Sequence, residues 1–188
     1  MFGKFSAASV AMIVLLAGMA VQGEEPAAPV KLQLRDLEIQ VPANWKQQQL
    51  ASSMRLAQFA IGPTEGDLDP AELAVFPPMG GSVSENVKRW IDQFQPSGRT
   101  YKTTTGKFPG GEYVLLDISG TFKKPDGPVM MQKTKPAPEY RMLAAMLLTD
   151  KGNYFIKFPG PTKTVEANVE NFRKIFGGDA SKEEPYAL

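Results

Sequence analysis

Apolar and polar residues alternate in several short segments of this chain, as they do in strands that bury one face. Segment 32–41 has this pattern and predicts one or two strands. Further strands are predicted at 54–61, 73–76, 101–108, 112–122, 141–149 and 154–158. Proline or glycine directly follows most of them, and the Asp-Lys-Gly-Asn turn at 150–153 joins the last two as a hairpin.

Two segments instead repeat their apolar residues at the period of an α-helix. The first stripe contains Val83, Val87, Trp90, Ile91 and Phe94, and the second contains Val165, Val169, Phe172 and Phe176. Ser82 and Glu85 form a capping box at the start of the first helix. The glycines at 177–178 end the second helix.

The two strand–turn–helix segments are alike when the chain is shifted by 82 positions. This shift aligns Phe76-Pro77 with Phe158-Pro159, Ser82 with Thr164, Asn86-Val87 with Asn168-Val169, Trp90 with Phe172, and Phe94 with Phe176. The predicted fold is α+β: a mostly antiparallel sheet built from two strand-strand-strand-helix units, with both helices on one face or one on each. Chance similarity between two amphipathic helices is the alternative to duplication.

The N-terminus has the three parts of a secretion signal. Lys4 precedes an apolar run at 7–21, and small residues follow it, so cleavage is expected after Gly23 or, second, after Ala20. A retained membrane anchor is the alternative, but the run is shorter than a spanning helix and contains Gly18. We therefore expect a signal peptide at 1–23, a linker at 24–30, a single α+β domain at 31–178 and a disordered tail at 179–188. The location is periplasmic or secreted, with no stable membrane span after cleavage.

The composition excludes several kinds of chemistry. The chain has no cysteine and no histidine, which removes disulfides, thiol nucleophiles, imidazole catalysis and histidine-ligated zinc. Its net charge is +1, and removal of Lys4 brings it to zero. Nucleic-acid binding is therefore disfavoured, and we expect no cofactor and no metal.

An acidic segment and two helix starts are weaker candidates. Asp67 and Asp69 lie in segment 65–72, which is too short for a calcium loop and contains Pro70, so a solvated turn is favoured over a cation site. The turns at 78–82 and 160–164 offer free helix amides to an anion, but a capped helix start without a ligand is favoured at both.

The connection at 123–139 contains four prolines and four lysines around Val129, Met130 and Met131. Irregular loops of this length are uncommon in compact domains unless they are used. The three apolar residues are predicted either to contact a partner or an anionic lipid surface, or to fold back as a lid over the sheet edge.

Four charged residues lie within the predicted strands: Arg55, Asp117, Arg141 and Lys157. If two or more share one face of the sheet, they form a paired cluster or line a pocket. On exposed faces they are ordinary solvated residues. They are candidate ligand- or partner-binding residues, together with Val129, Met130 and Met131, and no catalytic residue is predicted.

Several motifs resemble those of uncharacterised exported bacterial proteins with a PsbP-like or DcrB-like domain. The opening strand followed by Val41-Pro42 and Trp45 is one. Others are Met54–Phe59, Gly66-Asp67, Pro70–Phe76, Gly80–Val83, Asn86-Val87, Arg89-Trp90, Tyr154–Phe158 and Gly160-Pro161, in the expected order over most of 37–176. The resemblance implies an α/β/α-like sandwich around an antiparallel sheet and implies no reaction.

The predicted function is that of an exported, non-enzymatic domain that binds a protein partner or a small ligand in the cell envelope. Two alternatives remain open. One is a carboxylate- or cation-dependent hydrolase that uses Asp67 and Asp69. The other is a purely structural envelope component, which a structure without a concave, partly apolar pocket would favour.

Overall fold

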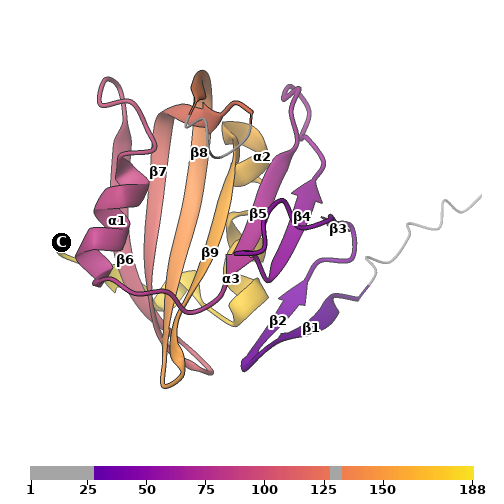
Figure 1. Cartoon of the computed structure of the whole chain (residues 1–188), viewed down its shortest axis with the longest axis vertical. Helices are drawn as coiled ribbons and strands as arrows, with labels where there is room; N and C mark the ends of the chain where they lie inside the picture. Colours follow the sequence, from indigo (N-terminus) through magenta and orange to yellow (C-terminus); the bar gives the residue numbers. More distant parts are fainter. Residues whose placement is uncertain (1–27, 128–132) are drawn as a thin grey trace, which may run out of the picture.

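The computed structural model describes residues 28–127 and 133–188, which form an eight-stranded antiparallel sheet with helices on it and a separate hairpin (Figure 1). The sheet order is β10-β6-β7-β8-β9-β5-β4-β3. The hairpin is β1 (Val30–Leu34) and β2 (Leu37–Val41); the sheet strands are β3 (Lys46–Gln47), β4 (Ala57–Ile61), β5 (Ala71–Phe76), β6 (Thr100–Phe108), β7 (Gly111–Pro125), β8 (Thr134–Thr149), β9 (Gly152–Pro161) and β10 (Glu184–Pro185). The helices are α1 (Val83–Ile91), α2 (Thr162–Glu166), α3 (Val169–Phe176) and the short 3-10 helix η2 (Ala180–Lys182).

This arrangement confirms an α+β fold with a mostly antiparallel sheet. The predicted signal peptide at 1–23 and the candidate residues Val129, Met130 and Met131 lie outside the described residues. Within the described part of the chain, no helix is long and apolar enough to cross a membrane.

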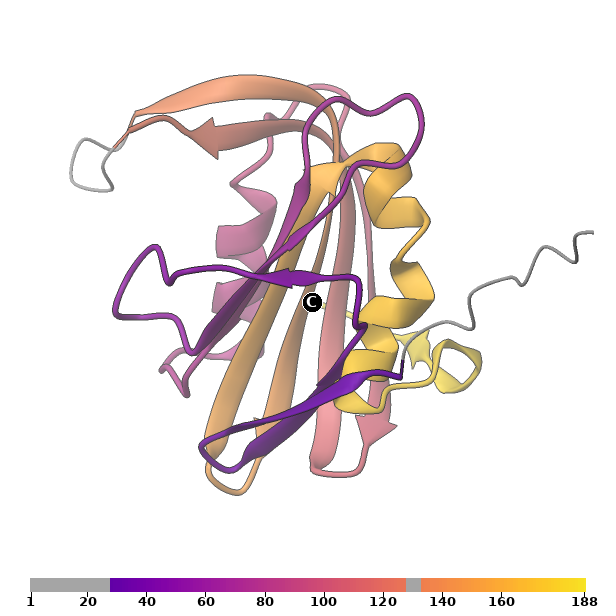
Figure 2. The ribbon, with the colours of Figure 1, turned by 90° about the vertical axis from the view of Figure 1, so that its right-hand side faces the viewer.

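The helices lie on opposite faces of the sheet: α1 on one, α2 and α3 on the other (Figure 2). The connection from β5 through α1 to β6 passes over three strands, and so does that from β9 through α2 and α3 to β10. Both lead toward the same edge, but β5 and β9 run in opposite directions. Crossovers between parallel strands are nearly always right-handed, so the two helical connections must cover opposite faces.

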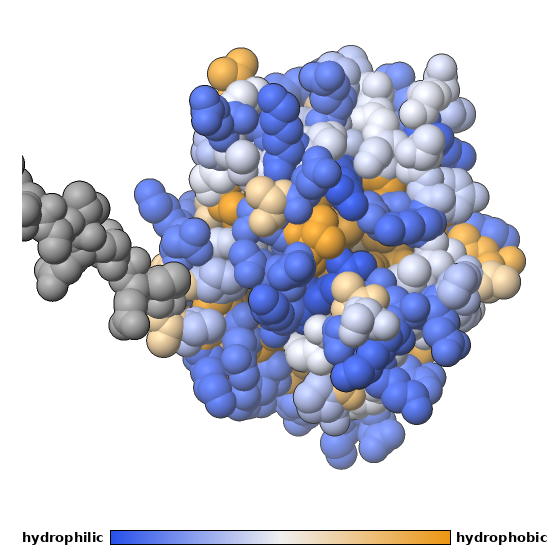
Figure 3. Space-filling view, turned by 180° about the vertical axis from the view of Figure 1, so that it is seen from behind, coloured by the Kyte–Doolittle hydropathy of each residue, from blue (hydrophilic) through white to orange (hydrophobic). Residues whose placement is uncertain are grey.

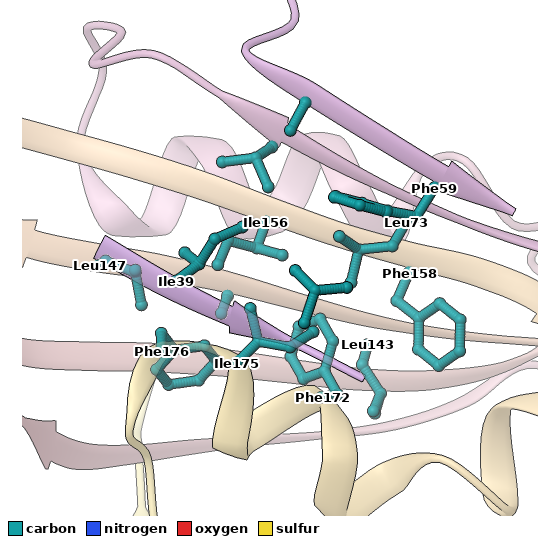
Figure 4. Packing of buried hydrophobic residues seen from close by; sticks show 14 of the residues in the cluster. Ile39, Phe59, Leu73, Leu143, Leu147, Ile156, Phe158, Phe172, Ile175 and Phe176 are labelled. Atoms are coloured by element: carbon teal, nitrogen blue, oxygen red, sulfur yellow. The ribbon is translucent and has the colours of Figure 1, made fainter. Parts of the chain in front are cut away.

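The larger core lies between the sheet and α2, α3 and the β1–β2 hairpin. Figure 4 shows Phe172, Ile175 and Phe176 pointing from α3 toward the sheet, with Ile39 of the hairpin close by. Phe172 stacks on Phe158 with ring centroids 6.0 Å apart. The predicted stripe of the second helix is therefore buried.

The smaller core lies under α1. Trp90 contacts the ring of Phe155 edge-on at 5.8 Å, and Phe94 contacts Phe122 at 5.2 Å. The predicted capping box is present, because the Ser82 hydroxyl accepts from Glu85 N while the Glu85 carboxylate accepts from Ser82 N. The first predicted helix is thus confirmed, although its regular part ends at Ile91 and the prediction ran to Phe94.

The second helix differs from its prediction. It is interrupted between α2 and α3, and Thr164 lies inside α2 although the 82-residue shift aligns it with the cap Ser82. The Thr164 hydroxyl donates to Asp67 at 2.6 Å, so a long-range contact uses the group that would have served as a cap. With the helices also on opposite faces, the structure does not show two equivalent units.

The predicted irregular connection at 123–139 is wrong for its described part. Strand pairing continues from β7 to Pro125 and from Thr134 along β8, after a bulge between Gly120 and Phe122. Gly120 has φ 148°, and a Cβ there would approach the Cα of Arg99 to 3.0 Å. Beyond this bulge the two strands form a ribbon (residues 121–125 and 134–139) that bends toward the face carrying α1, as Figure 2 shows.

The predicted disordered tail is also wrong, because an ion pair and a strand hold it. Glu183 accepts from Arg173 Nε at 2.6 Å and from Arg173 Nη2 at 2.9 Å. Tyr113 and Thr104 also donate to Glu183, and β10 pairs with β6. Burial alone would raise the pKa of Glu183, but the hydrogen bonds and the charge of Arg173 lower it overall. The C-terminal residues thus extend the sheet.

Arg173→Ala should lower the free energy of unfolding by about 3–5 kcal/mol, because it leaves the buried Glu183 carboxylate without its cation. The exposed neighbour substitution Lys174→Ala is the matched control. The difference between the parent chain and Arg173→Ala should shrink as the pH falls below about 4.5, where Glu183 begins to lose the charge that the folded state favours. Urea unfolding measures both effects, and equal stability of the two variants would show that the tail is not held this way.

Candidate functional site

A groove of about 580 Å³ lies on the α1 face, between the sheet and the ribbon. Its floor comes from β5 and β9, one wall from the residues that follow α1, and the other from the ribbon. The lining residues are Arg55, Pro70, Glu72, Ala74, Phe76, Asp92, Gln93, Phe122, Lys123, Lys124, Pro125, Thr134, Tyr140, Lys157 and Pro159. This volume is within the range of sites that hold small organic ligands.

The wall after α1 is fixed to the ribbon by backbone hydrogen bonds. Gln95 N donates to Thr121 O, and Lys123 N donates to Gln93 O, both at 2.8 Å. Phe94 and Phe122 form an isolated bridge between the two segments. These bonds place the side chain of Gln93 over the sheet, where it reaches the groove.

Lys157 stands on the floor of the groove between two small residues. Its neighbours across the sheet are Ala74 on β5 and Ala144 on β8. Its Nζ donates to Gln93 Oε1 at 2.6 Å. Because neither alanine fills the space beside it, the lysine side chain borders an open volume instead of packed core.

The surroundings of Lys157 favour its neutral form. Burial chiefly, and the positive charge of Arg55 to a lesser extent, lower the pKa of Lys157 to about 8, while the charge of Glu72 opposes the shift. The folded protein therefore holds this ammonium group at a cost at neutral pH.

Arg55 forms the outer part of the floor with acidic and amide partners. Its Nη1 donates to Glu72 Oε1 at 2.8 Å, and Gln58 Nε2 donates to Glu72 Oε2 at 2.9 Å. The guanidinium also lies 5.8 Å from the ring centre of Phe76. The charge of Glu72 is thus compensated by Arg55, so Glu72 does not serve as the counterion of Lys157.

The ribbon contributes aromatic rings and a second ion pair. Phe122 and Tyr140 stack with an interplanar angle of 7° and centroids 5.8 Å apart. Lys124 Nζ lies 3.0 Å from Asp69 Oδ2 and 3.1 Å from the Tyr140 hydroxyl. Burial would lower the pKa of Lys124, but the bonds to Tyr140 and Asp69 raise it overall. Lys124 therefore stays charged with its own counterion.

The four charged residues predicted from the strands separate into two groups. Arg55 and Lys157 both line the groove, although Arg55 lies just before β4 and not within a strand. Arg141 and Asp117 lie on the opposite face, where Arg141 Nε and Nη2 donate to the two carboxylate oxygens at 2.9 and 2.8 Å. The hydrogen bonds from Arg141 satisfy Asp117, so we assign this pair a structural role.

The acidic segment at 65–72 does not gather its carboxylates. Asp67 accepts from Thr164 N at 2.7 Å, whereas Asp69 pairs with Lys124. Among residues 28–127 and 133–188, no group of three or more acidic, histidine or cysteine side chains is placed to hold a metal ion. Both aspartates have structural partners, which weakens the hydrolase alternative.

Several groove residues were not predicted. Gln93, Phe122 and Tyr140 come from segments expected to be a helix end or a strand end, and their positions depend on the bent ribbon. By contrast, the sequence around Lys157 did indicate an unusual strand position. A lysine in the otherwise apolar run 154–158 indicates a strand position that is not ordinary core.

The opposite face also has hollows. Figure 3 shows it to be mostly polar, with apolar surface in a hollow near its centre. A hollow of about 480 Å³ beside the β1–β2 hairpin is lined by Tyr154, whose buried hydroxyl has no hydrogen-bond partner among residues 28–127 and 133–188. The charged side chains around this hollow are exposed to solvent. We therefore regard the groove at Lys157 as the candidate site.

Comparison with solved structures finds a similar fold in the PsbP class. The match is the solution structure of cyanobacterial PsbP (CyanoP) from Synechocystis sp. PCC 6803, with a TM-score of 0.49 and 13% identity, over 89% of this chain and 98% of that chain. No protein-family model matches the sequence, and no curated protein is significantly similar to it.

Lys157→Met should stabilise the protein at pH 7 by about 1–3 kcal/mol, since it removes a charge held in an unfavourable place. The unfolded chain keeps the lysine proton up to about pH 10.5, whereas the folded chain loses it near pH 8. The advantage of the variant should therefore decline as the pH rises from about 8 to 10.5. Urea unfolding at several pH values, with Lys174→Met as an exposed control, measures this. Destabilisation at pH 7 would contradict it.

Proposed function

We propose that this chain is an exported, non-enzymatic domain that binds a small ligand or a protein partner in the cell envelope, and that the groove at Lys157 is its binding site. One observation carries the proposal: a concave groove with an apolar wall and cationic side chains, built from segments far apart in the chain. Such convergence of polar groups in a partly apolar pocket is typical of ligand sites.

The residue types around the groove favour binding over catalysis. The chain has no histidine or cysteine to act as a proton relay or thiol nucleophile. The acidic side chain on the floor, Glu72, accepts hydrogen bonds from Arg55 and Gln58. The arginine and the three lysines that line the groove are hydrogen-bond donors, which can hold and orient a bound molecule.

Export is part of this proposal and rests on the N-terminal sequence. The basic start, the apolar run at 7–21 and the small residues after it support cleavage after Gly23 and a periplasmic or secreted location.

When the full chain is expressed in a Gram-negative host, the protein in the periplasm or medium should begin at Glu24. Mass spectrometry of the intact protein measures this. Replacing Leu15 and Leu16 by arginine should retain the chain in the cytoplasm, because the apolar run is broken. Recovery of uncleaved chain from the membrane fraction would instead support the anchor.

The groove should bind the neutral fluorescent probe phenylnaphthylamine at one site. Phe76→Ser should weaken this binding about tenfold, the order expected for losing one aromatic contact. Tyr101→Ser is the matched control, since Tyr101 is an exposed ring on β6, outside the groove. Equal affinity in all three proteins, or no binding by any, would contradict a binding groove here.

We also infer an internal duplication, on the basis of two asparagines that the 82-residue shift aligns. Asn86 Nδ2 donates to Ser82 O and Asn168 Nδ2 donates to Thr164 O, each at 2.9 Å. The Oδ1 atoms also match, because Asn86 accepts from Arg89 and Asn168 accepts from Asn171, three positions on in each case. This shared pattern supports a common origin of the two helical segments.

A further inference from the structure

Lys157 has hydrogen-bonding capacity that its protein neighbours leave unused. An ammonium group has three donors, and within residues 28–127 and 133–188 the acceptor for Nζ is Gln93 Oε1. In the same part of the chain, no carboxylate oxygen lies within 4.0 Å of Nζ. Two N–H groups are thus available on the floor of the groove.

The other charges around the groove do not supply a counterion for Lys157. Glu72 is paired with Arg55. The Asp92 carboxylate is 77% exposed and lies 3.9 Å from Arg99, a residue that does not line the groove. Four cationic residues and two acidic residues line the groove, so its charge is positive: Arg55, Lys123, Lys124 and Lys157 against Glu72 and Asp92.

A lysine in this position is unfavourable for the empty protein. Holding a charge among apolar neighbours without an opposite charge costs free energy unless something compensates it. The flanking Ala74 and Ala144 leave space beside the amine for such a group. A bound anion that accepts the two remaining donors satisfies both the charge and the hydrogen bonds.

The same groove offers an apolar surface next to this amine. Phe76 lies on β5, and the stacked Phe122 and Tyr140 lie on the ribbon opposite. We propose that the groove binds an amphiphilic anion, whose carboxylate, sulfonate or phosphate group is bound by Lys157 and whose apolar body lies against Phe76, Phe122 and Tyr140. This inference rests on the proposed binding function and specifies its ligand class.

The test compares two fluorescent probes that share one ring system, anilinonaphthalene sulfonate and neutral phenylnaphthylamine, on the full-length exported protein. At pH 7 the sulfonate should bind at least about tenfold more tightly, as expected for one charge-assisted hydrogen-bonded contact. Lys157→Met should remove most of this preference, because it removes the cation that the sulfonate contacts. Lys174→Met, an exposed substitution, should preserve the preference.

A second readout follows from the proton of Lys157. The preference for the sulfonate should decline above about pH 8 in the parent chain, because burial makes this amine lose its charge while Lys124 keeps its own. In Lys157→Met the small residual preference should not vary across this range.

The outcomes separate the two proposals. If the neutral probe binds and responds to Phe76→Ser but the sulfonate binds no better, the anion inference is overturned and the binding groove stands. The inference is also overturned if Lys157→Met keeps the preference. If neither probe binds the parent chain, the proposed function itself fails. Melting curves of every variant confirm that each one is folded before affinities are compared.

Discussion

The burial of both faces of one antiparallel sheet is the constraint on which the rest of the structure depends. Strands β7, β8 and β9 contribute side chains to both cores, as in the alternation of Met142 with Leu143 and of Phe155 with Ile156. A sheet with two apolar faces must be covered on both. The two helical crossovers and the β1–β2 hairpin cover these faces. The groove lies on the α1 face, next to the part of the sheet on which α1 packs.

The candidate site is a local exception to this burial. On the α1 face, α1 covers β7, β8 and the part of β9 at Phe155, while the groove floor around Lys157 and β5 lies beneath the ribbon instead of a helix. Small residues beside Lys157 and the bend after Gly120 leave a volume that neither helix nor ribbon fills. Sites in proteins often carry groups that do not stabilise the empty fold. A largely buried lysine without a counterion among the described residues is such a group, whereas Asp117 with Arg141 is an ordinary satisfied pair.

The predictions from the sequence succeeded where the relevant contacts are close along the chain and failed where they are distant. The capping box of Ser82 with Glu85 spans three residues and was found. The C-terminal strand was missed, because a polar tail gives no sign that Glu183 will reach Tyr113, 70 positions earlier. The unbroken apolar run from Met142 to Leu148 indicates a strand buried on both faces of a sheet. It does not indicate which helix covers which face.

The sequence by itself determined most of the strands, the two helical stripes, the absence of histidine and cysteine chemistry, and two of the residues that line the groove, Arg55 and Lys157. Periodicity and capping are properties of neighbouring residues, so they can be read without knowing the fold. Only the tertiary structure decided the neighbours of Lys157. Its partner Gln93 is 64 positions away and reaches it because the segment after α1 pairs with the ribbon, a contact that exists only once the sheet has formed.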